Sequence, residues 1–203
     1  MKILEIEKYK GSTYCIIFSD EKRIYLNSEI VSQYNLKPGI DIPEQAVEEI
    51  VAANDTRRAK EYALHLLSFK DFSYAELFKK LENNYAEGIC YDVCNKMVRL
   101  GFINDRRYAQ KLARNLFEVK HFGIHRVKQE MLLKGLPDEA VDEAVEKYED
   151  GTAERLSELI NKKYARYLTD ENGVKKVKAA LVRMGYSYSD IKAALNAYGE
   201  DEI

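Results

Sequence analysis

The sequence predicts a mainly α-helical protein of tandem three-helix repeats, elongated and curved, with a small β-hairpin-containing segment at its N-terminus. Three observations support this fold class. Apolar residues recur at a fixed offset, only Pro137 interrupts the helical periodicity after Pro43, and strand-favouring residues gather near the N-terminus.

The N-terminal segment has the pattern of short strands followed by short helices. Residues 10–12 and 20–22 are turn formers that separate runs of strand-favouring residues such as Ile16 and Phe18, which indicates hairpin connections. Asn27 and Ser28 are placed to cap a short helix that ends at residues 37–39.

The repeat is carried by apolar helix positions 50 residues apart (177 − 127 and 127 − 77). The same offset aligns Gly135 with Gly185. A repeat of this length is typical of stacked helical units, so we expect its apolar positions to be core. These positions are Leu77, Leu81, Val127, Met131, Val177 and Leu181.

The repeat divides the chain into four parts. These are residues 1–54 as the N-terminal β-containing segment with short helices, 55–104 as repeat 1, 105–150 as repeat 2 and 151–203 as repeat 3. After a further helix from Pro43, repeat 1 is expected to hold helices at about 57–68, 74–83 and 89–100.

Capping residues mark the helix ends. Ser73 with Glu76 has the form of a capping box, and Gly101 lies where a helix terminator belongs. Further starts are expected at Asp105, which would cap the next long helix, at Pro137 in a first turn, and at Ser187 and Ser189.

The charge total gives no general argument for a polyanionic partner. The chain has 32 basic and 34 acidic side chains, for a formal charge of −2. The charged N-terminus is unlike a signal peptide, no apolar run approaches the roughly 18 residues of a membrane span, and three cysteines favour a reducing compartment. We therefore expect a cytoplasmic protein with no membrane partner.

Patterns that would indicate catalysis or a cofactor are weak. The sequence has no phosphate-binding loop, dinucleotide fingerprint or nucleophile elbow. His121 and His125 have no third metal ligand nearby, and Cys90 and Cys94 are better explained as small core residues. We expect no enzyme activity, no metal and no cofactor.

Local charge is more informative than the total. Residues 106–134 hold eight basic and two acidic side chains, and residues 135–154 hold eight acidic and one basic. Residues 155–183 again hold eight basic side chains, against three acidic. If stacked units repeat one face, the basic helices form a stripe that neutralises phosphates.

Aromatic residues lie among these basic residues and could stack on unpaired bases. They are Tyr108, Phe117, Phe122, Tyr164 and Tyr167. The alternative is that the basic side chains only solubilise the helices and the aromatic rings belong to the core.

Several segments resemble the RecX regulatory family. Residues 65–81 (HLLSFKDFSYAELFKKL) look like the run that opens the family's first three-helix repeat, and residues 100–109 (LGFINDRRYA) look like its junction between repeats 1 and 2. Residues 122–136 (FGIHRVKQEMLLKGL) are similar to a segment of its repeat 2. The departures are residues 83–85, His121 and a loosely matching repeat 3.

The resemblance implies a monomeric modulator, mostly an inhibitor, of the RecA recombinase that binds in the groove of the RecA–single-stranded DNA filament. It implies effects on filament growth, ATP hydrolysis, strand exchange and the co-protease activity of the SOS response. The expected filament or nucleic-acid contacts are Arg106, Arg107, Lys111, Arg114, Arg126, Lys128, Lys175, Lys176 and Lys178.

Two other interpretations remain open. A helical-repeat scaffold that binds protein but no nucleic acid would also fit the balanced charge. A small DNA-binding transcription factor would need a helix that reads a duplex groove, and no such helix-turn-helix surface is evident.

Overall fold

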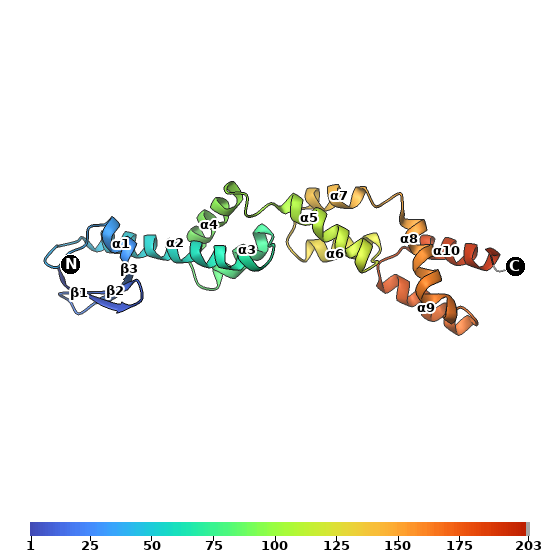
Figure 1. Cartoon of the computed structure of the whole chain (residues 1–203), viewed down its shortest axis with the longest axis horizontal. Helices are drawn as coiled ribbons and strands as arrows, with labels where there is room; N and C mark the ends of the chain where they lie inside the picture. Colours follow the sequence, from blue (N-terminus) through green and yellow to red (C-terminus); the bar gives the residue numbers. More distant parts are fainter. Residues whose placement is uncertain (202–203) are drawn as a thin grey trace. The chain divides into compact units, whose positions relative to one another are not determined.

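The computed structural model describes residues 1–201, with side chains to residue 199. The chain divides into two compact units. The first holds Met1–Lys70 and Leu77–Leu100, and the second holds Asp71–Glu76 and the chain from Gly101 onward. The fold is mainly helical with a small N-terminal sheet, as predicted (Figure 1).

The sheet is a three-stranded antiparallel meander in the order β1-β2-β3. Its strands are β1 (Ile3–Lys10), β2 (Thr13–Phe18) and β3 (Arg23–Asn27). Ile16 lies opposite both Ile6 and Ile24, and Ile16 and Phe18 are buried in the core of this segment. The turns fall at the two predicted groups of turn residues, with Gly11 in a left-handed conformation at φ 56°.

Two helices follow the sheet, α1 (Ser28–Gln33) and α2 (Glu44–Phe69). The predicted cap is confirmed, because the Asn27 side chain accepts the Glu29 N–H at 2.9 Å. The Asn54 side chain of α2 accepts the backbone N–H of Asn27 at 2.9 Å, which ties α2 to the sheet.

Two expectations about these helices were wrong. α1 ends at Gln33, before residues 37–39, because Asn35 adopts a left-handed conformation at φ 49°. The helix from Pro43 and the helix expected at 57–68 are one helix, since no glycine or proline interrupts α2.

The next two helices are α3 (Tyr74–Glu82) and α4 (Glu87–Arg99). The capping box of α3 is confirmed, since Ser73 Oγ accepts the Glu76 N–H at 3.0 Å and Glu76 accepts the Ser73 N–H at 3.3 Å. Gly101 follows α4 at φ 76°, as expected of a terminator. Leu77 and Leu81 are fully buried, as predicted.

The second unit contains two sets of three helices. The first set is α5 (Asp105–Arg114), α6 (Ile124–Leu132) and α7 (Asp138–Glu146). The second set is α8 (Thr152–Leu159), α9 (Glu171–Arg183) and α10 (Tyr188–Asp201). Each set has its own core, around Val127 and Met131 in the first and Val177 and Leu181 in the second. The division at 55, 105 and 151 stays a prediction.

The first helix of each set ends irregularly. α5 continues into a π-helical turn, η1 (Asn115–Val119), and α8 continues into a π-helical turn, η2 (Ile160–Tyr164). A 3₁₀ turn, η3 (Ala165–Tyr167), follows η2. The sequence patterns gave no sign of these wider turns, which often mark functional positions.

The predicted cap of α5 was wrong by one residue. Asn104 is the cap and accepts the Arg107 N–H at 2.9 Å, whereas Asp105 accepts the Tyr74 N–H at 3.0 Å. Both residue types cap helices well, and the tertiary contact with Tyr74 decides between them.

The later caps follow the prediction with small changes. Pro137 occupies the cap position of α7, one residue before its first turn. Ser187 Oγ accepts the Asp190 N–H at 3.1 Å and so caps α10, while Ser189 lies inside that helix.

Two close backbone approaches join helix starts to turns within the second unit. Gly185, at φ 90°, lies against the backbone of Arg126, and the Gly123 N–H donates to the Met184 carbonyl at 2.8 Å. Fifty residues earlier, Gly135 lies against the Cβ of Ala75, and Ser73 Oγ donates to the carbonyl of Lys134. A Cβ at either Gly135 or Gly185 would collide with its neighbour.

Candidate nucleic-acid interface

Six of the expected filament or nucleic-acid contacts lie on α5 and α6, and all six side chains have partners within the chain. Arg107 donates to the Gly101 carbonyl at 3.3 Å, and the other five form ion pairs with carboxylates. These pairs are Arg106–Glu143 at 3.4 Å, Lys111–Asp71 at 2.7 Å, Arg114–Glu118 at 3.0 Å, Arg126–Glu130 at 3.4 Å and Lys128–Asp142 at 2.7 Å. Exposed pairs of this kind contribute about 0–1 kcal/mol, so a phosphate can replace the carboxylate.

Arg126 has a structural role as well. Its guanidinium donates to the Arg183 carbonyl at 3.0 Å and lies 4.1 Å from the ring centroid of Phe122. Since its backbone also touches Gly185, this side chain holds the joint between α6 and the turn that follows α9.

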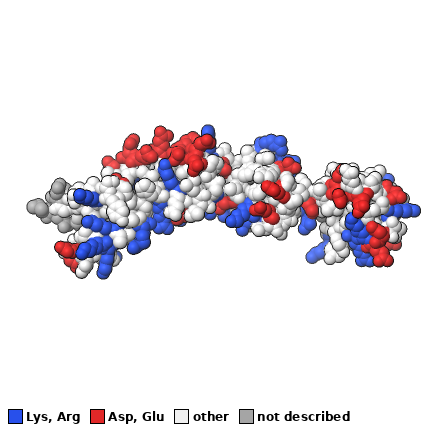
Figure 2. All heavy atoms as spheres, turned by 180° about the vertical axis from the view of Figure 1, so that it is seen from behind, with Lys and Arg blue, Asp and Glu red and all other residues white. Residues whose placement is uncertain are grey.

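The three expected lysines on α9, Lys175, Lys176 and Lys178, are exposed. None of them forms an ion pair within the part of the chain that the structure describes. Figure 2 shows basic side chains gathered over the α9 region of the second unit, opposite an acidic band over α7 and the loop after it. These three lysines of α9 therefore contribute positive charge that no described carboxylate pairs with.

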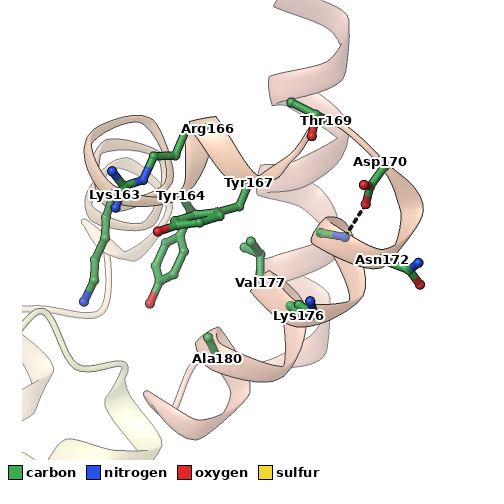
Figure 3. A pocket seen from close by; sticks show the side chains of 11 residues that line it. Lys163, Tyr164, Arg166, Tyr167, Thr169, Asp170, Asn172, Lys176, Val177 and Ala180 are labelled. Atoms are coloured by element: carbon green, nitrogen blue, oxygen red, sulfur yellow. Dashed lines mark hydrogen bonds between the residues drawn. The ribbon is translucent and has the colours of Figure 1, made fainter.

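A pocket of about 540 Å³ opens beside this helix (Figure 3). Lys163, Arg166 and Lys176 bring positive charge to it, and Tyr164 and Tyr167 bring aromatic rings. Lys163 and Arg166 were counted in the basic segment of the sequence but were not among the expected contacts. No spacing rule would have selected them, because η2 and η3 place them at the pocket.

The expected stacking residues divide into core and surface. Phe117 is 1% exposed and stacks on Tyr148 with ring centroids 4.3 Å apart, so it belongs to the core. Tyr108 is half-buried, and Phe122 is half-buried next to Arg126. Tyr167 is 47% exposed, and the Arg166 guanidinium lies 4.7 Å from its ring centroid.

The cysteines in α4 are buried core residues, as predicted. Burial raises the pKa of Cys94 to about 12 and raises the pKa of Cys90, so both stay as unreactive thiols at neutral pH. Among residues 1–201 no three His, Cys, Asp or Glu side chains are grouped so as to hold a metal ion. None of the helices in this range is both long and apolar enough to cross a membrane.

The arrangement of helices defines a helical-repeat protein built from three-helix units. Two family profiles match it, "RecX, second three-helix domain" over residues 104–145 and "RecX, third three-helix domain" over residues 149–195. Both profiles, together with the relatives and solved structures described below, support a RecX family protein.

Relatives along most of the chain carry the same name. "Regulatory protein RecX" of Clostridioides difficile (strain 630) is 29% identical over 196 residues, which cover 95% of this chain and 92% of the relative. The protein of that name from Streptococcus sanguinis (strain SK36) is 27% identical over 96% of this chain and 76% of the relative.

Two crystal structures share the fold. RecX from Lactobacillus salivarius is 28% identical with a TM-score of 0.65, covering 71% of this chain and 97% of that one. A structure of regulatory protein RecX has a TM-score of 0.70 at 22% identity, covering 96% and 98% of the two chains.

Proposed function

We propose that this chain is a regulator that binds the RecA–single-stranded DNA filament. It modulates, mostly by inhibition, the recombinase, ATPase and co-protease activities of RecA in DNA repair and the SOS response. The match to the RecX family carries this proposal, since relatives along almost the whole chain are named as regulatory proteins. We further propose that it acts in the cytoplasm as a monomer without a cofactor.

The charge distribution supports a filament as the partner. The lysines of α9 lack ion pairs among the described residues and can neutralise phosphates. The acidic residues of α7, Asp138, Glu139, Asp142, Glu143 and Glu146, can meet basic patches on protein subunits, where complementary charge fixes the register. Tandem units make several such contacts at once, so modest local affinities combine.

The first test is ATP hydrolysis by RecA on single-stranded DNA, titrated with this chain from far below the RecA concentration up to equality. We expect inhibition at strongly substoichiometric amounts, because a ligand that spans or ends a growing filament affects many subunits. An unchanged rate across the titration, with the chain folded by circular dichroism, would contradict the proposal.

A protein-binding scaffold without nucleic-acid affinity is the second candidate. It is favoured by one observation. All six of the expected contact residues on α5 and α6 already have partners within the chain, so a phosphate would have to displace those partners. Salt-sensitive binding to single-stranded DNA or to the filament distinguishes the two candidates, since a scaffold of this kind has no phosphate contacts to lose.

A further inference from the structure

The pocket beside α9 arises from features of its own set of helices. The 50-residue offset would place the start of α9 at residue 174 (124 + 50), but α9 begins three residues earlier at Glu171. The extra turn faces η2 and η3, and the space between them is the pocket (Figure 3). No equivalent turn precedes α6, where η1 is followed directly by a short loop.

The pocket wall is held by backbone contacts. Asp170 caps α9 by accepting the Gly173 N–H at 2.6 Å. Gly173 lies so close to the Tyr167 carbonyl that a Cβ would collide with it. The irregular turn and the helix start are thereby fixed against each other, which leaves Tyr164 and Tyr167 preorganised at the pocket.

The polar groups of the pocket favour an anion. Lys163, Arg166 and Lys176 line it, and none of them forms an ion pair with a described residue. The one carboxylate in the lining belongs to Asp170, which is already engaged as a helix cap. The site thus offers three cations against one carboxylate.

The apolar groups favour a flat ring. Figure 3 shows the Tyr164 and Tyr167 rings next to each other, facing Val177 and Ala180 of α9, with Arg166 beside Tyr167. Tyr164 donates a hydrogen bond to Met184 Sδ at 3.5 Å, which holds its ring, whereas Tyr167 is 47% exposed. An exposed aromatic ring under a guanidinium is a stacking surface for a nucleobase.

We propose that this pocket, between η2–η3 and the start of α9, binds one unpaired nucleobase of single-stranded DNA together with its neighbouring phosphates. The base stacks against Tyr167 and Arg166, and Lys163 and Lys176 contact the phosphates on either side. The inference rests on the proposed function for its partner, and a free nucleotide with the same chemistry is the other source of the ligand.

The test is binding of a fluorescein-labelled thymidine oligonucleotide to the full chain, followed by anisotropy without RecA. Tyr167→Ala is expected to weaken binding roughly 5- to 150-fold, the range for removing one base–aromatic stack, while Tyr167→Phe keeps near wild-type affinity. Tyr188→Ala is the matched control, because Tyr188 is 78% exposed at the start of α10 and lies outside the pocket.

A second pair of variants tests the phosphate contact. Lys176→Gln is expected to weaken binding and to reduce the slope of log affinity against log salt by about 0.7, the value for one phosphate contact on a single strand. Lys192→Gln, an exposed lysine of α10 outside the pocket, is expected to change neither.

Competition identifies the source of the base. Displacement by unlabelled oligonucleotide but not by millimolar thymidine monophosphate supports a site for a strand. Displacement by the monophosphate at micromolar concentration would overturn the strand assignment in favour of a free nucleotide.

Two further results would overturn the assignment of this pocket as a base-binding site. One is wild-type affinity in a folded Tyr167→Ala variant, and the other is an absence of oligonucleotide binding by the wild type. The RecA titration tests the proposed function independently of these two results. If the chain inhibits RecA while its pocket variants bind oligonucleotide as the wild type does, the proposed function stands and the pocket assignment fails. If oligonucleotide binding depends on Tyr167 but RecA is not inhibited, the pocket assignment stands and the proposed function fails.

Discussion

At the scale of the residue, Asp105 is a carboxyl group in a position that disfavours its ionised form. Its side chain is half-buried, accepts the Tyr74 N–H at 3.0 Å and lies near Glu76. Burial raises the pKa of Asp105, the Tyr74 hydrogen bond partly opposes this, and the Glu76 charge adds to it. The folded pKa is therefore above the unfolded one, so stability falls as pH rises from the unfolded value of about 3.8 through the folded value.

Asp105→Asn should remove this pH dependence and keep the contact, since the amide oxygen still accepts the Tyr74 N–H. We expect a higher free energy of unfolding than in the wild type at pH 7, and a much smaller difference near pH 3.5, where the wild-type carboxyl is mostly protonated in both states. Urea unfolding at the two pH values measures this. Asp92→Asn, at an exposed position of α4, is the control. A difference of equal size at both pH values would contradict the explanation.

At the scale of the element, the joints within the second unit depend on main-chain contact. Gly185 at φ 90° and Gly135 at φ 68° both end a turn after a helix and both face the first turn of another helix. A side chain at either position would face two penalties, a strained left-handed conformation and a collision with its neighbour.

Gly185→Ala is expected to destabilise the chain by about 1–2 kcal/mol from the left-handed backbone alone, with more from the contact with Arg126. Gly88→Ala is the matched control, because Gly88 lies in α4 with open space around it, and alanine there should be neutral or stabilising by up to about 1 kcal/mol. Thermal and urea unfolding measure both. Equal effects of the two substitutions would show that the joint is not the cause.

The helical units were predictable because their signals are local. Apolar spacing placed Leu77, Leu81, Val127 and Met131 in cores, and Ser73 marked a helix start through its own side chain. The cap of α5 could not be chosen by such rules, since Asn104 and Asp105 are both good caps and a distant N–H from Tyr74 selects between them.

The candidate site was only partly predictable for a related reason. The lysines of α9 followed from charge counting, and Tyr164 and Tyr167 from their place among basic residues. Their grouping with Lys163 and Arg166 depends on the π-helical end of α8 and on the extra turn of α9. Both are departures from the repeat, so an alignment at a fixed offset does not reveal them.

At the scale of the whole molecule, a net charge of −2 hides strong local segregation. The acidic residues of α7 and the lysines of α9 belong to the same compact unit, where Figure 2 shows them in separate regions. A near-neutral chain can therefore still have a salt-dependent interaction with a polyanion, because binding responds to the local charge that meets the phosphates.

Reversing two of these charges should show this directly. We expect Lys175→Glu with Lys178→Glu to weaken binding to the RecA–single-stranded DNA filament and to reduce the salt slope by about 1.4, or about 0.7 for each phosphate contact. Lys8→Glu with Lys10→Glu in β1 makes the same change in net charge at exposed positions of the sheet. Equal losses in the two double variants would attribute the effect to net charge instead of to α9.

The main-chain joints at Gly135 and Gly185 have a consequence for how such a chain can evolve. A helix start that docks on a glycine carbonyl or Cα makes few demands on the side chains around it. A gene segment coding for one unit, duplicated with its glycine, would carry its own connector and fit against a helix start of the previous copy. Mutation could then make one copy acidic and the next basic without remaking the connection between them.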